Sequence, residues 1–341
     1  YEIVTIAPMD EYSSKLEEMG FEYHNIKINN KGTNPFEDAK LVYDFYKLYK
    51  SLKIDLILHY TIKPNIYGSI AANMLNIPVV NNISGLGTVF LNDGLSSKIA
   101  KFLYKLALKT PKKVFYQNLH DKNLFVELNL VKSELTGLLP GSGIDINTFK
   151  PSSRKISEKN KIKFLLIARL IKDKGIVEYV DAARVLKESY PESECLILGS
   201  YYSGNPTAIE EETIRKWEEE GLIEYLGTSN NVKEIIEQVD CIVLPSYREG
   251  LSRVLLEAAS MSKPIITTNV PGCMEVVDDG INGYICKVKD HNSLANKMKK
   301  IVSLSDIELK EMGCKGREKI INEFDERIVI KKYMDEINKY L

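Results

Sequence analysis

The segment DCIVLPSYREGLSRVLLEAASMSKPIITTN, residues 240–269, alternates between two kinds of pattern. An unbroken apolar run, CIVL, ends at Pro245-Ser246, and a second such run, PIITT, closes the segment. Between them, RVLLEAAS has apolar residues at the spacing of a helix. Two continuously apolar strands joined by a helix are typical of a parallel sheet covered by helices on both faces. This segment therefore predicts an α/β domain.

The same alternation continues along the chain. Strand-like runs occupy 1–8, 54–59, 77–84, 113–118, 133–141, 162–170, 194–200, 223–228, 240–246, 263–269 and 282–288. Stretches such as 38–52 and 66–76 between them have the helical period. The polar stretch KPSSRKISEKNK, 150–161, divides the series in two. We therefore expect two Rossmann-like, doubly wound domains, 1–150 and 151–322, and a helix over 323–341 that crosses back to the first domain.

The first strand-like run, YEIVTIAP, raises a difficulty. A doubly wound domain begins with a central strand and a glycine-rich turn, and neither is found upstream of this run. YEIVTIAP resembles a second strand instead. We therefore expect that one βα unit of about 25–35 residues precedes residue 1.

The composition excludes several classes of protein. The chain has 341 residues, of which 44% are apolar and 27% charged, and its formal net charge is −1. This balance is typical of a globular protein, and nucleic acid is not an expected partner. No run is apolar and long enough for a bilayer span, and no signal peptide is recognised. Five scattered cysteines without metal-ligand spacing indicate reduced thiols in a cytoplasmic protein.

Two glutamates stand out in the opening segment. Glu249 lies in the loop after the strand, before Gly250, and Glu257 lies in the helical run. The two glutamates are eight positions apart, and at about 100° per residue of helix this spacing would bring both side chains to one side of the helix. Paired carboxylates accept hydrogen bonds from sugar or ribose hydroxyls. The alternative is that Glu257 is a surface residue and that Glu249 is a charge favoured by the helix dipole.

A second group of residues follows the first strand of the second domain. Arg169 and Lys174 lie between that strand and the start of a helix. Two cations beside free N–H groups form an anion site, although two solvated charges would give the same sequence. Gly199 ends the next strand, and a glycine there lets the backbone approach a ligand closely.

Together these motifs resemble the retaining glycosyltransferases of family four, whose fold is GT-B, two Rossmann-like domains facing across a cleft. The resemblance spans essentially the whole chain and is strongest over 164–290. It rests on Arg169, Lys174-Gly175, Leu198-Gly199, Pro245-Ser246, Glu249-Gly250, Glu257-Ala258, Pro271-Gly272, Gly280, Gly283 and PGSGIDINTFKP at 140–151.

The resemblance implies a role for each site residue. Glu257 would hold the ribose of a nucleoside-diphosphate sugar, expected to be a UDP-sugar. Glu249, with the backbone of Gly250, Leu251 and Ser252, would hold the sugar. Arg169 and Lys174 would bind the diphosphate beside Gly199 and stabilise the leaving nucleotide. No Asp-x-Asp motif is present, so no cofactor and no essential divalent metal are expected.

The first domain would bind the acceptor. His59 and Lys63 follow one strand, and Gly85 and Gly87 follow another, so these four residues are the candidate acceptor site. A packing or capping role for His59 is an open alternative. Many family members carry a histidine in the 81–90 loop, which this sequence lacks, and this departure leaves catalytic roles in the first domain unassigned.

The first domain also has a basic segment. Residues 88–133 hold eight lysines and three acidic residues. On a helix within 96–113, Lys98, Lys101, Lys105 and Lys109 form a stripe beside Ile99, Phe102, Leu103 and Leu106. Such a helix binds an anionic membrane, here the inner face of the cytoplasmic membrane, or simply packs on its own sheet.

The sequence therefore predicts a hexosyl- or N-acetylhexosaminyltransferase. Its acceptor would be a polysaccharide, a lipopolysaccharide or a polyprenyl-diphosphate-linked saccharide. Two alternatives stay open at this point. One is a nucleotide-sugar epimerase of the same fold, which lacks the paired glutamates, and the other is a non-catalytic nucleotide-sugar-binding module, which the two glutamates and two cations disfavour.

Overall fold

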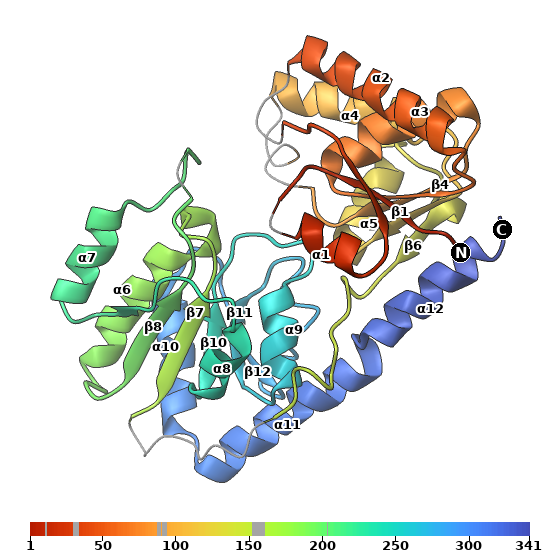
Figure 1. Ribbon diagram of the computed structural model, residues 1–341. Helices are drawn as coiled ribbons and strands as arrows, with labels where there is room; N and C mark the ends of the chain where they lie inside the picture. Colours follow the sequence, from red (N-terminus) through yellow and green to blue (C-terminus); the bar gives the residue numbers. More distant parts are fainter. Residues whose placement is uncertain (11, 30–33, 87–89, 91–93, 152–160, 203) are drawn as a thin grey trace. The chain divides into compact units, whose positions relative to one another are not determined.

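A computed structural model of the protein describes residues 1–10, 12–29, 34–86, 90, 94–151, 161–202 and 204–341 (Figure 1). The chain packs into two compact units. The first is Tyr1–Leu138 together with Tyr333–Leu341, and the second is Leu139–Lys332. Of the polar stretch expected as the linker, residues 150, 151 and 161 belong to the second unit, and 152–160 fall outside the described residues.

The second unit contains a six-stranded parallel sheet in the order β12-β11-β10-β7-β8-β9. Its strands are β7 Lys163–Ile167, β8 Glu194–Leu198, β9 Glu224–Tyr225, β10 Cys241–Leu244, β11 Ile265–Thr268 and β12 Gly283–Cys286. Each of these six strands lies within a run predicted from the sequence, so the second series of strands is confirmed.

The continuous apolar character of these strands follows from burial on both faces. Phe164 and Leu166 of β7 belong to one apolar core, and Leu165 and Ile167 belong to another. Successive side chains of a strand point to opposite faces, so one strand supplies two cores. Helices cover the sheet (Figure 1) and are α6 Ile176–Lys187, α7 Glu211–Glu219, α8 Val232–Glu237, α9 Arg253–Ser260, α10 His291–Ser303, α11 Asp306–Glu323 and the first part of α12 Glu326–Ile337, with a 3₁₀ turn, η4, at Lys172–Lys174.

The first unit contains two parallel sheets. The larger has the order β3-β4-β5-β6, and the smaller consists of β1 and β2. The strands are β1 Val4–Ala7, β2 Glu22–Asn25, β3 Ile57–Tyr60, β4 Val79–Ile83, β5 Lys113–Tyr116 and β6 Thr136–Leu138. The helices are α1 Ser13–Glu18, α2 Pro35–Leu52, a π-helix η1 Pro64–Gly68, α3 Ser69–Leu75, α4 Leu95–Ala107, α5 Leu119–Glu127 and a 3₁₀ turn η3 Ser133–Leu135.

A cavity of about 1490 Å³ lies in the first unit. Residues of β1 and β3 line it, as do Ile99 and Leu103 of α4 and Met334 of α12. Within the described residues, β1 is hydrogen-bonded to β2 and β3 is hydrogen-bonded to β4, and β1 is not paired with β3. The two sheets are therefore separate, and the cavity extends between them.

The end of α12 completes the first unit. Tyr60, Asn82 and Phe115 occupy paired positions of β3, β4 and β5 and so form a row across the sheet. Tyr333 packs on this row, with its ring centroid 6.1 Å from that of Tyr60 and 5.3 Å from that of Phe115. Asn82 Nδ2 donates to Tyr333 Oη at 2.8 Å. None of the described helices combines the length and the apolarity that a bilayer-spanning helix needs.

Candidate functional site

Lys174 and Glu249 meet at the carboxyl ends of two neighbouring strands. β7 and β10 are parallel hydrogen-bonded neighbours, so the turn after β7 lies beside the loop after β10. Lys174 Nζ lies 2.5 Å from Glu249 Oε1, and Ser246 Oγ donates to the same oxygen at 2.7 Å. The Lys174 and Glu249 side chains are 17% and 15% exposed. We call Lys174, Ser246 and Glu249 the carboxylate cluster.

Close backbone packing fixes the carboxylate cluster. Gly175 has φ +72°, and a Cβ there would collide with the carbonyl oxygen of Pro245. Only glycine therefore lets the turn after Lys174 approach the end of β10. On the other side of the loop, the N–H of Glu249 donates to Pro271 O at 3.2 Å. The loop is thus held from both sides, and the Lys174–Glu249 contact follows from that placement.

The three residues after Glu249 were predicted to offer backbone N–H groups to a ligand. Ser252 does not offer its own, because its N–H donates to Gly272 O at 2.9 Å. Ser252 is instead the N-cap of α9, since its side chain accepts from the N–H of Leu255. Leu251 packs against Gly141. Gly250 and Leu251 are partly exposed, and they remain candidates for ligand contact.

Glu257 lies on α9, four residues after Arg253. Because α9 begins at Arg253, Glu249 is outside the helix, and the angle expected from helical spacing does not relate the two glutamates. Arg253 Nε donates to Glu257 Oε1 at 2.9 Å. Burial raises the pKa of Glu257, and the bond from Arg253 acts in the opposite direction. Glu257 is buried, so the reading of it as a surface helix residue is excluded.

Arg169 follows β7 and has an exposed side chain. Its guanidinium carbon lies 4.8 Å from the ring centroid of Tyr202. Gly199, the next predicted residue, donates its N–H to Gly227 O at 2.8 Å, and a Cβ there would collide with the carbonyl oxygen of Ala168. Gly199 therefore allows the ends of β7 and β8 to approach each other beside Arg169.

His59, predicted at the acceptor site, is buried in the first unit. Its Nε2 lies 2.9 Å from Tyr49 Oη, and its Nδ1 lies 3.2 Å from Asn81 Oδ1. Burial lowers the pKa of His59 to about 4, so the ring is neutral near pH 7. These contacts favour the packing role that the sequence left open.

The other predicted acceptor residues differ in their surroundings. Lys63 Nζ lies 2.7 Å from Asp38 Oδ1, with both side chains largely buried, so its charge is already paired. Gly85 follows β4 and is partly exposed. Gly87 lies outside the described residues. Within the described part of this group, Lys63 and His59 both line the large cavity, and Gly85 does not.

The basic segment forms α4, which ends at Ala107, so Lys109 lies beyond the helix. Ile99, Phe102 and Leu106 are 43%, 68% and 46% exposed. Lys98, Lys105 and Lys109 are exposed and Lys101 is half-buried, while Tyr104 and Ala107 are buried. The opposite side of α4 thus packs on its own unit, and the predicted apolar strip, apart from half-buried Leu103, is left at the surface.

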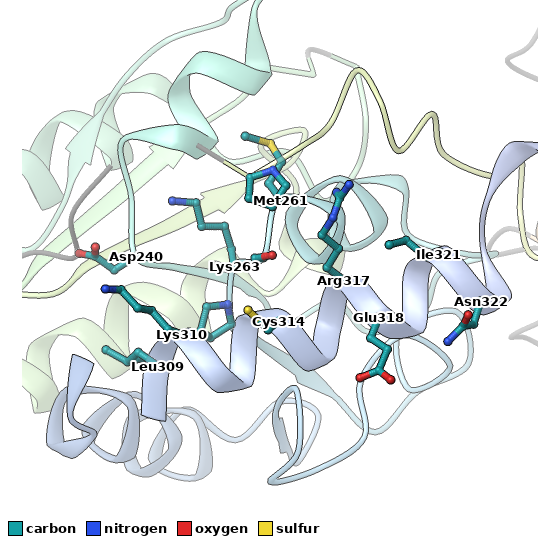
Figure 2. Close-up of a pocket in the computed structure, with 13 residues that line it drawn as sticks. Asp240, Met261, Lys263, Leu309, Lys310, Cys314, Arg317, Glu318, Ile321 and Asn322 are labelled. Atoms are coloured by element: carbon teal, nitrogen blue, oxygen red, sulfur yellow. The ribbon is translucent and has the colours of Figure 1, made fainter. Parts of the chain in front are cut away.

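A second cavity, of about 550 Å³, lies in the second unit beside α11 (Figure 2). Asp240 and Pro264 of its lining precede β10 and β11, so it lies at the amino ends of these strands. Arg317 donates to the carbonyl oxygens of Phe149 and Ile146, and Lys263 donates to that of Val239. These side chains hold neighbouring backbone together, and no predicted site residue lines this cavity.

Sequence reasoning missed two residues. Ser246 was quoted as part of a motif but received no role, although it bonds to Glu249. Tyr202 was not singled out, because its contact with Arg169 depends on how the loop after β8 folds. A search for aromatic residues after strand ends in the same sheet would have found Tyr202, together with its neighbour Tyr201.

Comparison with known families identifies the class of protein to which the chain belongs. A family model described as glycosyl transferases group 1 matches residues 149–319, and one described as glycosyl transferase 4-like matches residues 1–118. The chain belongs to the glycosyl transferases group 1 family. It is therefore a glycosyltransferase, and the resemblance inferred from its motifs is confirmed.

Curated relatives cover most of the chain. It is 27% identical over 98% of its length, and 90% of the relative's, to the N,N'-diacetylbacillosaminyl-diphospho-undecaprenol α-1,3-N-acetylgalactosaminyltransferase of Campylobacter jejuni. It is 27% identical, over 85% of its length and 76% of the relative's, to a UDP-Gal:α-D-GlcNAc-diphosphoundecaprenol α-1,3-galactosyltransferase of Escherichia coli. Both names describe transferases that act on lipid-linked saccharides.

Solved structures share the fold. The Anabaena protein HepE in complex with UDP has a TM-score of 0.81 at 18% identity, covering 99% of this chain and 100% of that one. A glycosyltransferase of Rickettsia africae has a TM-score of 0.78 at 20% identity, covering 97% and 88%. The architecture is thus the GT-B fold expected from the sequence.

Proposed function

We propose that the protein transfers a sugar from a nucleoside-diphosphate sugar to a polyprenyl-diphosphate-linked saccharide during surface polysaccharide assembly, with retention of anomeric configuration. We take a UDP-sugar as the donor. The carboxylate cluster carries this proposal, because it places a cation and a carboxylate together at the carboxyl ends of β7 and β10. Ligands of parallel sheets bind at these ends.

The donor diphosphate would lie against the turn after β7. Lys174 and Arg169 supply two cations there, and Lys174 is held in place by Glu249. When the bond to the sugar breaks, negative charge develops on the leaving nucleotide. Cations that are already oriented stabilise that charge more than they stabilise the bound donor, and this difference lowers the barrier.

The two glutamates would bind different parts of the donor. One oxygen of Glu249, Oε1, already accepts bonds from Lys174 and Ser246, which leaves Oε2 for a sugar hydroxyl. Glu257 is buried and accepts one bond from Arg253, so its remaining oxygen can accept a ribose hydroxyl. Burial strengthens a hydrogen bond to either carboxylate, because less water competes.

The acceptor assignment is supported by α4. Exposed apolar side chains beside lysines suit a headgroup layer, where a polyprenyl-diphosphate acceptor would lie. The two curated relatives described above act, by their names, on undecaprenol-diphosphate-linked substrates. We propose that α4 places the protein at the inner face of the cytoplasmic membrane.

The proposal is tested by removing the two cations. Each of Arg169→Ala and Lys174→Ala should cost about 2.7–4 kcal/mol of transition-state stabilisation, as expected for a lost preorganised donor. The double variant should have no measurable transfer from a UDP-sugar, although its circular dichroism spectrum should match that of the parent. Near-normal turnover by the double variant would overturn the assigned anion site.

A further inference from the structure

The charged side chains of Arg169 and Lys174 have different partners. Lys174 is fixed by Glu249, and both side chains are largely buried. Arg169 is exposed, and within the described residues no carboxylate forms a salt bridge with it. Its guanidinium lies over the ring of Tyr202. An exposed arginine has many rotamers, so an aromatic face beside it limits where the guanidinium can go.

Backbone pairing brings the segment before Tyr202 close to Arg169. Beyond the ends of β7 and β8, the N–H of Ala168 donates to Leu198 O at 3.0 Å, and the N–H of Leu170 donates to Ser200 O at 2.9 Å. A further bridge pairs Leu170 with Tyr201. The two strand ends therefore stay parallel past Arg169 and as far as Tyr201, the residue before Tyr202. This pairing brings Tyr202 close enough for its ring to contact the Arg169 guanidinium.

We propose that Tyr202 is a positioning residue for the donor diphosphate, because its ring holds the Arg169 guanidinium at the anion site. This inference rests on the proposed function. A guanidinium that lies against a ring has its N–H groups directed outward in its own plane, where they can donate to phosphate oxygens. The contact requires the aromatic face and not the hydroxyl group.

The neighbouring tyrosine provides a matched control. Tyr201 lies in the same loop, and its ring packs against Tyr225 with a centroid distance of 5.5 Å. Tyr201 is thus the same residue type in the same loop, but its ring contacts Tyr225. Loss of Tyr201 tests whether damage to this loop alone weakens binding.

The experiment measures binding of UDP and uridine by calorimetry. Tyr202→Leu should weaken UDP binding about two- to fivefold, the range of an exposed cation–π contact. Tyr202→Phe and the control Tyr201→Leu should bind UDP as the parent does. Uridine binding should be the same in all four proteins, because uridine has no phosphate for Arg169 to contact.

A double-mutant cycle decides the mechanism. In an Arg169→Gln background, Tyr202→Leu should cause no further loss of UDP affinity, since there is no guanidinium left to hold. An equal loss in both backgrounds, or equal losses for UDP and uridine, would overturn the proposal and show a structural role. If the parent protein itself binds no UDP, the proposed donor is wrong, a result distinct from failure of the Tyr202 proposal.

Discussion

The two glutamates that first indicated sugar chemistry have unlike surroundings. Glu249 is in a loop and shares one oxygen with Lys174 and Ser246. Glu257 is in a helix, buried, and bonded to the exposed Arg253. Because their surroundings differ, the two carboxylates would suit different parts of one donor. This difference in role can be measured as a difference in ligand binding.

Substitution of each glutamate by glutamine should therefore give distinct binding losses. Glu257→Gln should weaken binding of both UDP and the UDP-sugar, because both contain the ribose. Glu249→Gln should weaken the UDP-sugar more than UDP, because it removes the contact with the sugar as well as the carboxylate that holds Lys174. Each loss should be about 1.5–3 kcal/mol, the range for hydrogen bonds to charged groups. Calorimetric titration of both variants with both ligands measures these losses.

Glu275→Gln is a suitable control, since Glu275 Oε2 accepts from the N–H of Gly272 in the neighbouring turn. It tests whether losing a carboxylate beside the loop is enough to weaken binding. Equal losses for UDP and the UDP-sugar in the Glu249 variant would contradict the separate roles.

Residue type and spacing were sufficient to place Lys174 and Glu249 at strand ends of one sheet, although neither their contact nor the bond from Ser246 was predicted. Lys174 and Glu249 both follow apolar runs, and parallel strands bring such residues to one edge. The burial of His59 could not be predicted, because a histidine at the end of a strand looks the same whether or not a helix covers it. The contact with Tyr49, ten residues earlier in the sequence, arises only once α2 has packed on β3.

At the scale of single elements, α4 has a packed side and an exposed side. The exposed side combines three apolar residues with lysines. Each lysine near an anionic surface is worth about 1 kcal/mol, so several together hold a protein weakly and reversibly.

Changing Lys98, Lys101, Lys105 and Lys109 to glutamine should release the protein from vesicles that contain anionic lipid. The parent protein should cosediment with such vesicles, and less so as salt rises, because salt screens these charges. Activity on a lipid-linked acceptor should fall, while activity on a short water-soluble acceptor should persist. Cosedimentation and both transfer assays measure these effects.

A second quadruple variant, Lys15, Lys27, Lys47 and Lys50 to glutamine, makes the same change of charge on exposed residues elsewhere in the first unit. It should bind vesicles as the parent does. Equal loss in both variants would show that net charge matters and that α4 is not a specific surface.

The strands of the second unit were predictable because burial on both faces makes them continuously apolar. β2 was not predicted, since its sequence, EYHN, is polar and four residues long. The π-helix at Pro64–Gly68 also gave no signal, because the helical period of the 66–76 stretch does not distinguish it from the α-helix that follows.

For the whole molecule, the division of the chain differs from the one expected. Residues 139–151 pack with the second unit, where Arg317 donates to two of their carbonyl oxygens. The last part of α12, from Tyr333, packs with the first unit. Composition located a polar stretch near the boundary, but long-range packing decides where a unit ends.

Tyr333→Phe should destabilise the first unit by about 1–3 kcal/mol, because it leaves the buried Asn82 amide without this hydrogen bond. The chain has one tryptophan, Trp217, and it lies in α7 of the second unit. When this variant is unfolded in urea, part of the transition seen by circular dichroism should therefore shift to a lower urea concentration than in the parent. The transition seen by tryptophan fluorescence, which reports on the second unit, should keep its midpoint.

Tyr340→Phe provides the comparison, since the half-buried Tyr340 donates its hydroxyl to Glu336, a carboxylate that also bonds to Lys339. Its effect should be within about 0.5 kcal/mol. A shift of the fluorescence midpoint in Tyr333→Phe equal to the shift in circular dichroism would show that the two units unfold together.

The contribution of α12 to the first unit also affects how the protein is made. Chains grow on the ribosome from the amino terminus, and domains usually fold in that order as they emerge. Here the row formed by Tyr60, Asn82 and Phe115 is covered only after Tyr333 has been synthesised. The domain translated first is therefore the one completed last, and a chain halted early would expose that row to chaperones and proteases.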